Sequence, residues 1–66
     1  MNKIYMLNVT NKDDEFQMPF STAEKAQAFI LTNFKRDMPK MLTSELYYGT
    51  KNTYVIDEMA VDQTTL

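Results

Sequence analysis

The segment Phe20–Ala26, which reads F-S-T-A-E-K-A, constrains the fold most because it marks where an extended chain turns into a helix. Ser21 and Glu24 have the S-x-x-E spacing of a capping box, in which each side chain accepts a hydrogen bond from the other residue's backbone N–H. The sequence therefore predicts that Ser21 is the N-cap of a helix and that a strand ends just before it.

The predicted helix runs from this cap to the neighbourhood of Asp37. Pro39 disfavours helical geometry at the residue before it, so we expect a helix of about sixteen residues. Spacings of three and four residues give the helix one apolar stripe. Its members are Ala23, Ala26, Phe29 or Ile30, and Phe34.

Two strands are predicted before the helix. Residues 3–9 are almost continuously apolar, which is typical of a central strand covered on both faces. A polar turn follows, and residues 16–18 then alternate between apolar and polar as a short second strand. Pro19 has no backbone N–H, so it either ends this strand or marks a sheet edge. The two strands should form an antiparallel hairpin.

The region after the helix is less clear. Residues 39–48 fit either a second short helix, opened by Pro39 and closed by Gly49, or a chain that becomes a strand at 45–48, which we prefer. Residues 49–52 then form a turn and 53–56 a strand, which extends through Met59 and Val61 if a bulge occurs at 57–58. The expected fold is one α+β domain over 1–66, with three or four antiparallel strands and one helix on one face. The element order is β-β-α-β-β, or β-β-α-β as the simpler alternative.

The 66 residues include no histidine and no cysteine, and they carry a net charge of −2. A domain this small buries only about 60% of its unfolded surface, so its stability is marginal. The basic residues are scattered, which argues against direct nucleic-acid binding. The chain begins with a strand pattern rather than a signal peptide, and no apolar run has the length of a membrane span. We expect a cytoplasmic protein of a bacterial host cell.

Catalytic chemistry has few candidate residues in this chain. Histidine, the usual general base near neutral pH, is missing, and the single glycine excludes a glycine-rich phosphate loop. Acidic residues at 13–15 lack the spacing of an EF-hand loop and are interpreted as a solvated turn. Asp57 and Glu58 point to opposite faces of a regular strand, so they do not form a pair. We expect no enzyme activity, no metal and no cofactor.

Tyrosine and methionine suggest a protein interface instead, since both residue types are enriched where proteins meet. A sheet with a single helix leaves its second face uncovered, and that face is either polar or covered by a partner, such as a second copy of the chain in a homodimer. An equally weighted alternative is ordinary core packing and cross-strand pairing. The expected partner-binding residues are Asp13, Asp14, Glu15, Tyr47, Tyr48, Tyr54, Asp57 and Glu58. The expected exposed face includes Tyr5, Leu7, Val9, one of Tyr47 and Tyr48, and Tyr54 or Val55.

Three segments carry a resemblance: K-I-Y-M-L near the N-terminus, F-S-T-A-E-K-A-Q-A-F-I, and Y-V-I-D-E-M-A-V-D. Together they resemble small uncharacterised bacterial and phage proteins that open their helix with F-S-T-x-E-K-A. The chain is also similar in type to phage anti-defence inhibitors such as anti-CRISPR proteins, by size, acidity and lack of catalytic groups. This likeness is one of kind, and it supplies no functional residue.

Two functional hypotheses follow. The first is a non-catalytic protein-binding module, of phage or mobile-element origin, that inhibits a host defence protein such as a CRISPR nuclease. One acidic face, made of residues 13–15, Asp57, Glu58 and Asp62, would occupy a basic nucleic-acid channel. The alternative is a small oligomer that binds a nucleotide-type signal molecule between subunits, with tyrosines stacking on the base and Lys35, Arg36 or Lys40 meeting the phosphate.

Overall fold

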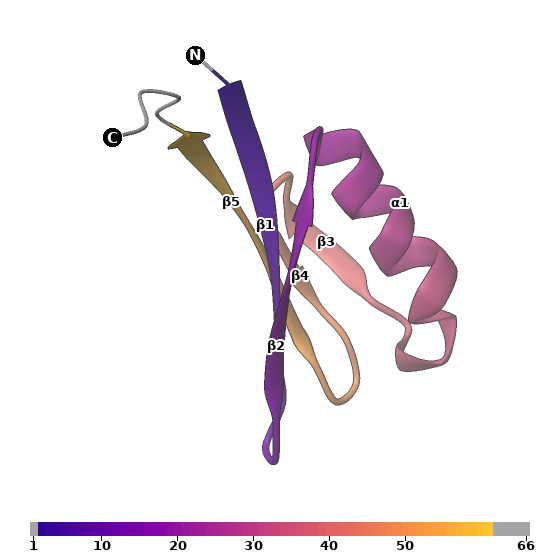
Figure 1. The fold of residues 1–66 in the computed structure, drawn as a ribbon. Coiled ribbons are helices and arrows are strands. Elements are labelled where there is room, and N and C mark those ends of the chain that lie inside the picture. Colours follow the sequence, from indigo (N-terminus) through magenta and orange to yellow (C-terminus); the bar gives the residue numbers. More distant parts are fainter. Residues whose placement is uncertain (1, 62–66) are drawn as a thin grey trace.

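The computed structural model of the protein describes residues 2–61, with side chains described for 3–60. One helix packs across one face of an antiparallel sheet, which confirms the predicted α+β class (Figure 1). The sheet of the described residues has five strands rather than three or four. The elements are β1 (Asn2–Thr10), β2 (Glu15–Phe20), α1 (Ala23–Asn33), the 3-10 helix η1 (Lys35–Asp37), β3 (Lys40–Thr43), β4 (Leu46–Tyr48) and β5 (Thr53–Val61).

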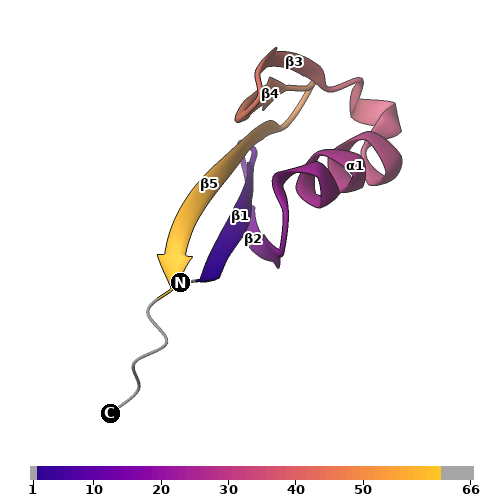
Figure 2. The same ribbon diagram turned by 90° about the horizontal axis from the view of Figure 1, so that it is seen from above.

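The strand order is β2-β1-β5-β4-β3, and every neighbouring pair is antiparallel. β1 pairs with both β2 and β5, so its predicted central position is confirmed, as are the two predicted hairpins. Figure 2 shows the sheet curving, with α1 on one side only. Pro19 lies within β2, opposite Met6, and β2 is an edge strand, where a missing N–H costs no ladder hydrogen bond.

The helix begins one residue later than the capping box predicts. Thr22 has an extended backbone, and its Oγ1 accepts a hydrogen bond from the N–H of Lys25 at 3.1 Å. With Thr22 as N-cap, the third helical residue is Lys25. Its ammonium group cannot accept a hydrogen bond from the backbone N–H of Thr22, as the side chain at this position does in a capping box. The predicted Ser21–Glu24 box is therefore wrong. β2 continues to Phe20, in register with Tyr5, and Ser21 is left as the exposed link between strand and helix.

The helix also ends earlier than predicted. The N–H of Phe34 bonds to the carbonyl of Ile30 at 3.0 Å, and the chain then tightens into η1. Met38 follows with φ 51° and ψ 56°, a left-handed conformation that stops any helix. The predicted helix of about sixteen residues is thus an α-helix of 11 residues and a separate 3-10 turn.

The core lies between α1 and the sheet face beneath it. Odd-numbered residues of β1 pair with Tyr54 and Ile56 of β5 and with apolar residues of β2, so their side chains face α1. The expected exposure of Leu7 and Val9 is therefore wrong, since both are buried, and Tyr5 packs against the same core. The buried residues are Leu7, Val9, Ala26, Ile30, Tyr47, Tyr54 and Ile56.

Two further predictions for the C-terminal half are corrected. Asp57 pairs with Met6 and Glu58 with Tyr5 in an unbroken register, so β5 has no bulge at 57–58. The shift in register lies instead between Met41 and Thr43. Residues 40–43 form β3, which decides against the alternative of a second short helix.

The N-cap assignment yields the first prediction. Thr22→Ala removes the acceptor for the Lys25 N–H and should lower the free energy of unfolding by about 1 kcal/mol. In a domain of this size that corresponds to a melting temperature lower by about 4–8 °C. Ser21→Ala is the matched control and should change the melting temperature little. If Ser21→Ala is the more damaging substitution by circular dichroism melting, the N-cap assignment is wrong.

Candidate functional site

β3 forms an open edge of the sheet. It pairs only with β4, and no other described helix or strand contacts it. All four of its residues are exposed, and Met41 and Leu42 keep 54% and 52% of their surface. An edge strand presents unpaired backbone N–H and C=O groups, which are a template for pairing with another chain. The β3 edge therefore combines free backbone groups with exposed apolar side chains.

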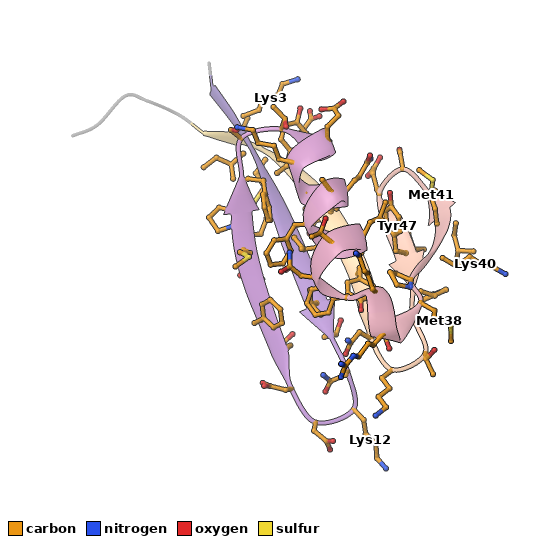
Figure 3. The ribbon with its side chains drawn as sticks, turned by 90° about the vertical axis from the view of Figure 1, so that its right-hand side faces the viewer. Lys3, Lys12, Met38, Lys40, Met41 and Tyr47 are labelled. Carbon is orange, nitrogen blue, oxygen red and sulfur yellow. The ribbon has the colours of Figure 1, made fainter. Side chains whose placement is uncertain are left out.

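Further apolar side chains adjoin this strand. Met38, just before β3, is 71% exposed, and Tyr48 of β4 is 49% exposed and pairs with Lys40. In Figure 3, Met38, Lys40 and Met41 extend outward at the β3 side of the molecule. We call this set the β3 edge surface: Met38, Lys40, Met41, Leu42 and Tyr48.

The opposite edge, β2, is protected. Pro19 removes one donor from it, and β2 contacts α1. The ring of Phe16 stacks against Phe34 with centroids 6.2 Å apart. The two edges of the sheet are therefore unequal, and β3 is the more accessible for pairing.

The three tyrosines expected to bind a partner have different positions. Tyr48 is exposed on the outer face of β4. Tyr47 and Tyr54 are buried, because their strand positions face α1, and Figure 3 shows Tyr47 beside the helix. A surface role for Tyr47 and Tyr54 is therefore excluded by packing. Alternation along β4 could predict that one of Tyr47 and Tyr48 is buried, but not which one.

The acidic residues do not share a face. Asp13, Asp14 and Glu15 lie at and beside the β1–β2 turn. Asp57 is on the helix-free face of the sheet, whereas Glu58 is on the helix side and forms an ion pair with Lys3 at 3.2 Å. Asp62 is outside the described residues. The expected single acidic face is therefore not formed by the residues that the structure describes.

The β1–β2 turn satisfies its own backbone. Asn11 Oδ1 accepts hydrogen bonds from the N–H groups of Asp13 at 2.8 Å and Asp14 at 2.7 Å. The N–H of Asn11 bonds to the carbonyl of Asp14 at 2.9 Å. Such an Asx turn is typical of asparagine and explains why Asn11 and the acidic residues after it occur here as turn-forming residues. Within residues 2–61, no three acidic side chains are grouped so that they could hold a metal ion.

The helix-free face carries a polar network at its centre. Gln17 Nε2 donates to Asn8 Oδ1 at 2.7 Å, and Asn8 Nδ2 donates to Asp57 Oδ2 at 2.9 Å. Apolar side chains of Met6 and Val55 lie beside this network, across from Asp57 and Asn8 respectively. Because hydrogen-bonded polar groups cross the face, it does not offer one continuous apolar surface.

Asp37 has a structural role that the sequence did not indicate. Its carboxylate accepts hydrogen bonds from Tyr54 Oη at 2.7 Å, the Lys51 N–H at 2.6 Å and the Asn52 N–H at 3.1 Å. Its carbonyl accepts the N–H of Thr50 at 2.7 Å. Desolvation raises the pKa of Asp37, but the bonds from Tyr54, Lys51 and Asn52 outweigh it and leave the pKa below its ordinary value. Asp37 thus fastens η1 to the β4–β5 turn.

The same contacts act on the tyrosine. Burial, together with the hydrogen bond to the Asp37 carboxylate, raises the pKa of Tyr54 to about 12. A tyrosinate at this position would be both desolvated and next to a negative charge. Tyr54 therefore stays a neutral hydrogen-bond donor at the end of the core.

A hollow of about 490 Å³ lies beside this contact, between the end of α1, η1 and the β4–β5 turn. Lys35, Arg36 and Lys51 line it. Lys40, the third basic residue expected to meet a phosphate, lies on β3 and does not line it. The fold thus brings Lys35 and Arg36 together with Lys51, which is distant from them in the sequence and was not predicted to join them.

Comparison with family models, with curated proteins and with solved structures gives no match. None of the helices in residues 2–61 combines the length and the apolar character needed to cross a membrane. The geometry of the β3 edge and of the hollow therefore carries the functional argument.

The Asp37 contact explains why residue 49 is glycine and gives the second prediction. A Cβ on Gly49 would collide with the Asp37 carboxylate, although the backbone there is not left-handed. Gly49→Ala should therefore lower the free energy of unfolding by about 1–3 kcal/mol, as overpacking does. The same substitution in an Asp37→Ala background should cost clearly less. Equal costs in the two backgrounds, measured by urea unfolding, would contradict the collision.

Acid sensitivity gives the third prediction. Because the folded pKa of Asp37 lies below its unfolded value, the ionised carboxylate stabilises the fold above its ordinary pKa of 3.8. That contribution is lost as the pH falls through the lowered folded pKa. Wild type should therefore be more stable than Asp37→Asn at pH about 7, and the difference should shrink by pH about 2–3.

Urea midpoints of the two proteins at each pH measure this difference. Other carboxylates titrate equally in both proteins, so the comparison isolates Asp37. A gap between wild type and Asp37→Asn that stays constant down to low pH would show that the Asp37 charge contributes nothing.

Proposed function

We propose that the chain is a non-catalytic protein-binding module that pairs with an extended segment of another protein along β3. The observation that supports this best is the open β3 edge with its exposed Met41 and Leu42. In strand addition, main-chain hydrogen bonds supply affinity and alternate side chains supply specificity. The β3 edge surface provides both.

The details of the edge favour a selective partner over indiscriminate pairing. β3 is only four residues long, carries the charge of Lys40 and has its irregularity between Met41 and Thr43. Short length, lysine and irregular register are the features by which natural sheets limit edge-to-edge aggregation. They restrict the partner to a short extended segment whose side chains fit against Met38, Met41 and Leu42.

The side chains at this edge suit recognition. Methionine is flexible and polarizable, so it adapts to a partner's surface, and tyrosine is a frequent interface residue. Met38, Met41 and Tyr48 keep about half or more of their surface exposed. Exposed apolar surface of this kind, gathered along one edge of a sheet, commonly marks an interaction site.

The proposed partner is a host protein, such as a nuclease of a bacterial defence system. This choice follows from the likeness in type to phage anti-defence inhibitors, and the composition, without histidine or cysteine, fits a binder better than an enzyme. Since the described acidic residues are spread over the molecule, the proposal relies on strand pairing and apolar contact. It does not use an acidic face that imitates nucleic acid.

The fourth prediction tests this site. The double variant Met41→Lys/Leu42→Lys should lose capture of the partner from a bacterial lysate, measured by quantitative mass spectrometry. Both side chains are exposed, so the free energy of unfolding should change little. Met59→Lys is the matched control: Met59 is 48% exposed, but it lies on β5 opposite Ile4. Capture by this control should equal that of wild type.

Two outcomes would overturn the proposal. One is capture of the same proteins, in the same amounts, by the β3 variant. The other is a doubled mass of the purified chain in light scattering that the β3 variant reduces to a monomer. That result would assign the edge to a second copy of the chain instead of a host protein.

A further inference from the structure

The hollow beside η1 brings three cations together from two parts of the chain. Lys35 and Arg36 come from η1, and Lys51 comes from the β4–β5 turn. At about 490 Å³ the hollow lies within the size range of small-molecule sites. It is separate from β3, whose residues do not line it.

The charge of the lining is opposite to that of the whole chain. Three cations and the single carboxylate of Asp37 give the lining a net charge of +2, whereas the chain carries −2. The Asp37 oxygens already accept three hydrogen bonds, so this carboxylate is committed to the fold. Among the described residues, no ion pair engages any of the three cations. A concave region lined by one sign of charge concentrates ligands of the other sign.

From this arrangement we infer that the hollow binds a small phosphate-bearing molecule. An arginine guanidinium can hold two phosphate oxygens at once, and lysine ammonium groups add point charges. Thr32 and Thr50 also line the hollow and offer hydroxyl donors. Phe34, which is partly buried, also lines the hollow and adds apolar surface for the organic part of such a ligand.

The site is held in place before any ligand arrives. Asp37 follows Arg36 directly, and it accepts the backbone N–H groups of Lys51 and Asn52. The two segments that supply the cations are therefore fastened to each other at the rim of the hollow. Binding then orders only the ends of long side chains, which keeps its entropic cost small.

A titration of the full chain, followed by amide chemical shifts in nuclear magnetic resonance, tests the inference with ADP and with inorganic pyrophosphate. Saturable shifts should be confined to residues 32–37 and 50–52. In Lys35→Gln/Arg36→Gln the dissociation constant should rise by at least about tenfold. The control Lys12→Gln/Lys25→Gln removes the same charge from exposed positions outside both the hollow and the β3 edge surface, and it should bind like wild type.

Comparison of the two ligands shows what is recognised. Tighter binding of ADP than of pyrophosphate supports contact of the organic part with Phe34, and equal binding supports a site for the phosphates alone. No saturable shifts at about 10 mM ligand would overturn the inference. Equal weakening of phosphate binding in the control variant would also overturn it. So would a titration with a short DNA strand in which the amide signals of every lysine-bearing segment shift alike. The β3 variant should bind the phosphate compounds normally, so this inference and the proposed protein binding fail independently.

Discussion

The arrangement of the C-terminal half depends on the hydrogen bonds that the Asp37 carboxylate accepts. Three hydrogen bonds to the side chain and carbonyl of Asp37 join the irregular segment after α1 to the β4–β5 turn, and a fourth comes from Tyr54 of β5. This tie fixes where the chain leaves the helix and therefore where β3 joins the sheet. Since hydrogen bonds to a charged acceptor are stronger than neutral ones, a single side chain can hold a segment that has little apolar burial of its own.

The same carboxylate links the surface to the core. Tyr54 is fully buried, packs its ring against Phe34 with centroids 5.1 Å apart, and reaches Asp37 with its hydroxyl. A buried hydroxyl without a partner would cost about 1–3 kcal/mol. The Tyr54 hydroxyl has two partners, since it donates to Asp37 and accepts from Asn52 Nδ2 at 3.1 Å, and these bonds offset the cost of its burial. No described buried side-chain polar atom lacks a partner. Core packing and the position of η1 are thus parts of one arrangement.

Local signals in the sequence predicted the elements whose causes are local. The hydrophobic run of 3–9, the polar turns and the apolar spacing of Ala26 and Ile30 indicated both hairpins, the central strand and the helix. Ser21 and Thr22 are adjacent and both carry a hydroxyl group that can cap a helix, so the sequence located the N-cap only to within one residue. The helix end could not be read locally, because Asp37 is held by residues fourteen to seventeen positions away.

Faces and sites were harder to predict for a related reason. Alternation in a strand separates two sets of side chains, but it does not show which set the helix covers. Tyr5, Leu7 and Val9 were therefore assigned to the wrong side, and the choice between Tyr54 and Val55 stayed open. Both candidate sites likewise arise from residues joined by the fold: Lys51 reaches Lys35 and Arg36 through the Asp37 contact, and Met41 becomes an edge residue only because β3 is the last strand.

The two candidate sites adjoin one short stretch of chain, and this determines how they relate. Lys35 and Arg36 face the hollow, Asp37 ties the stretch down, and Met38 leads into β3. Asp37 holds this stretch through four hydrogen bonds, so the fold itself positions the backbone of both candidate sites. A ligand at one site can change affinity at the other only if it binds two arrangements of this stretch differently. The Asp37 contact favours one arrangement, so the sites should act independently while it is intact.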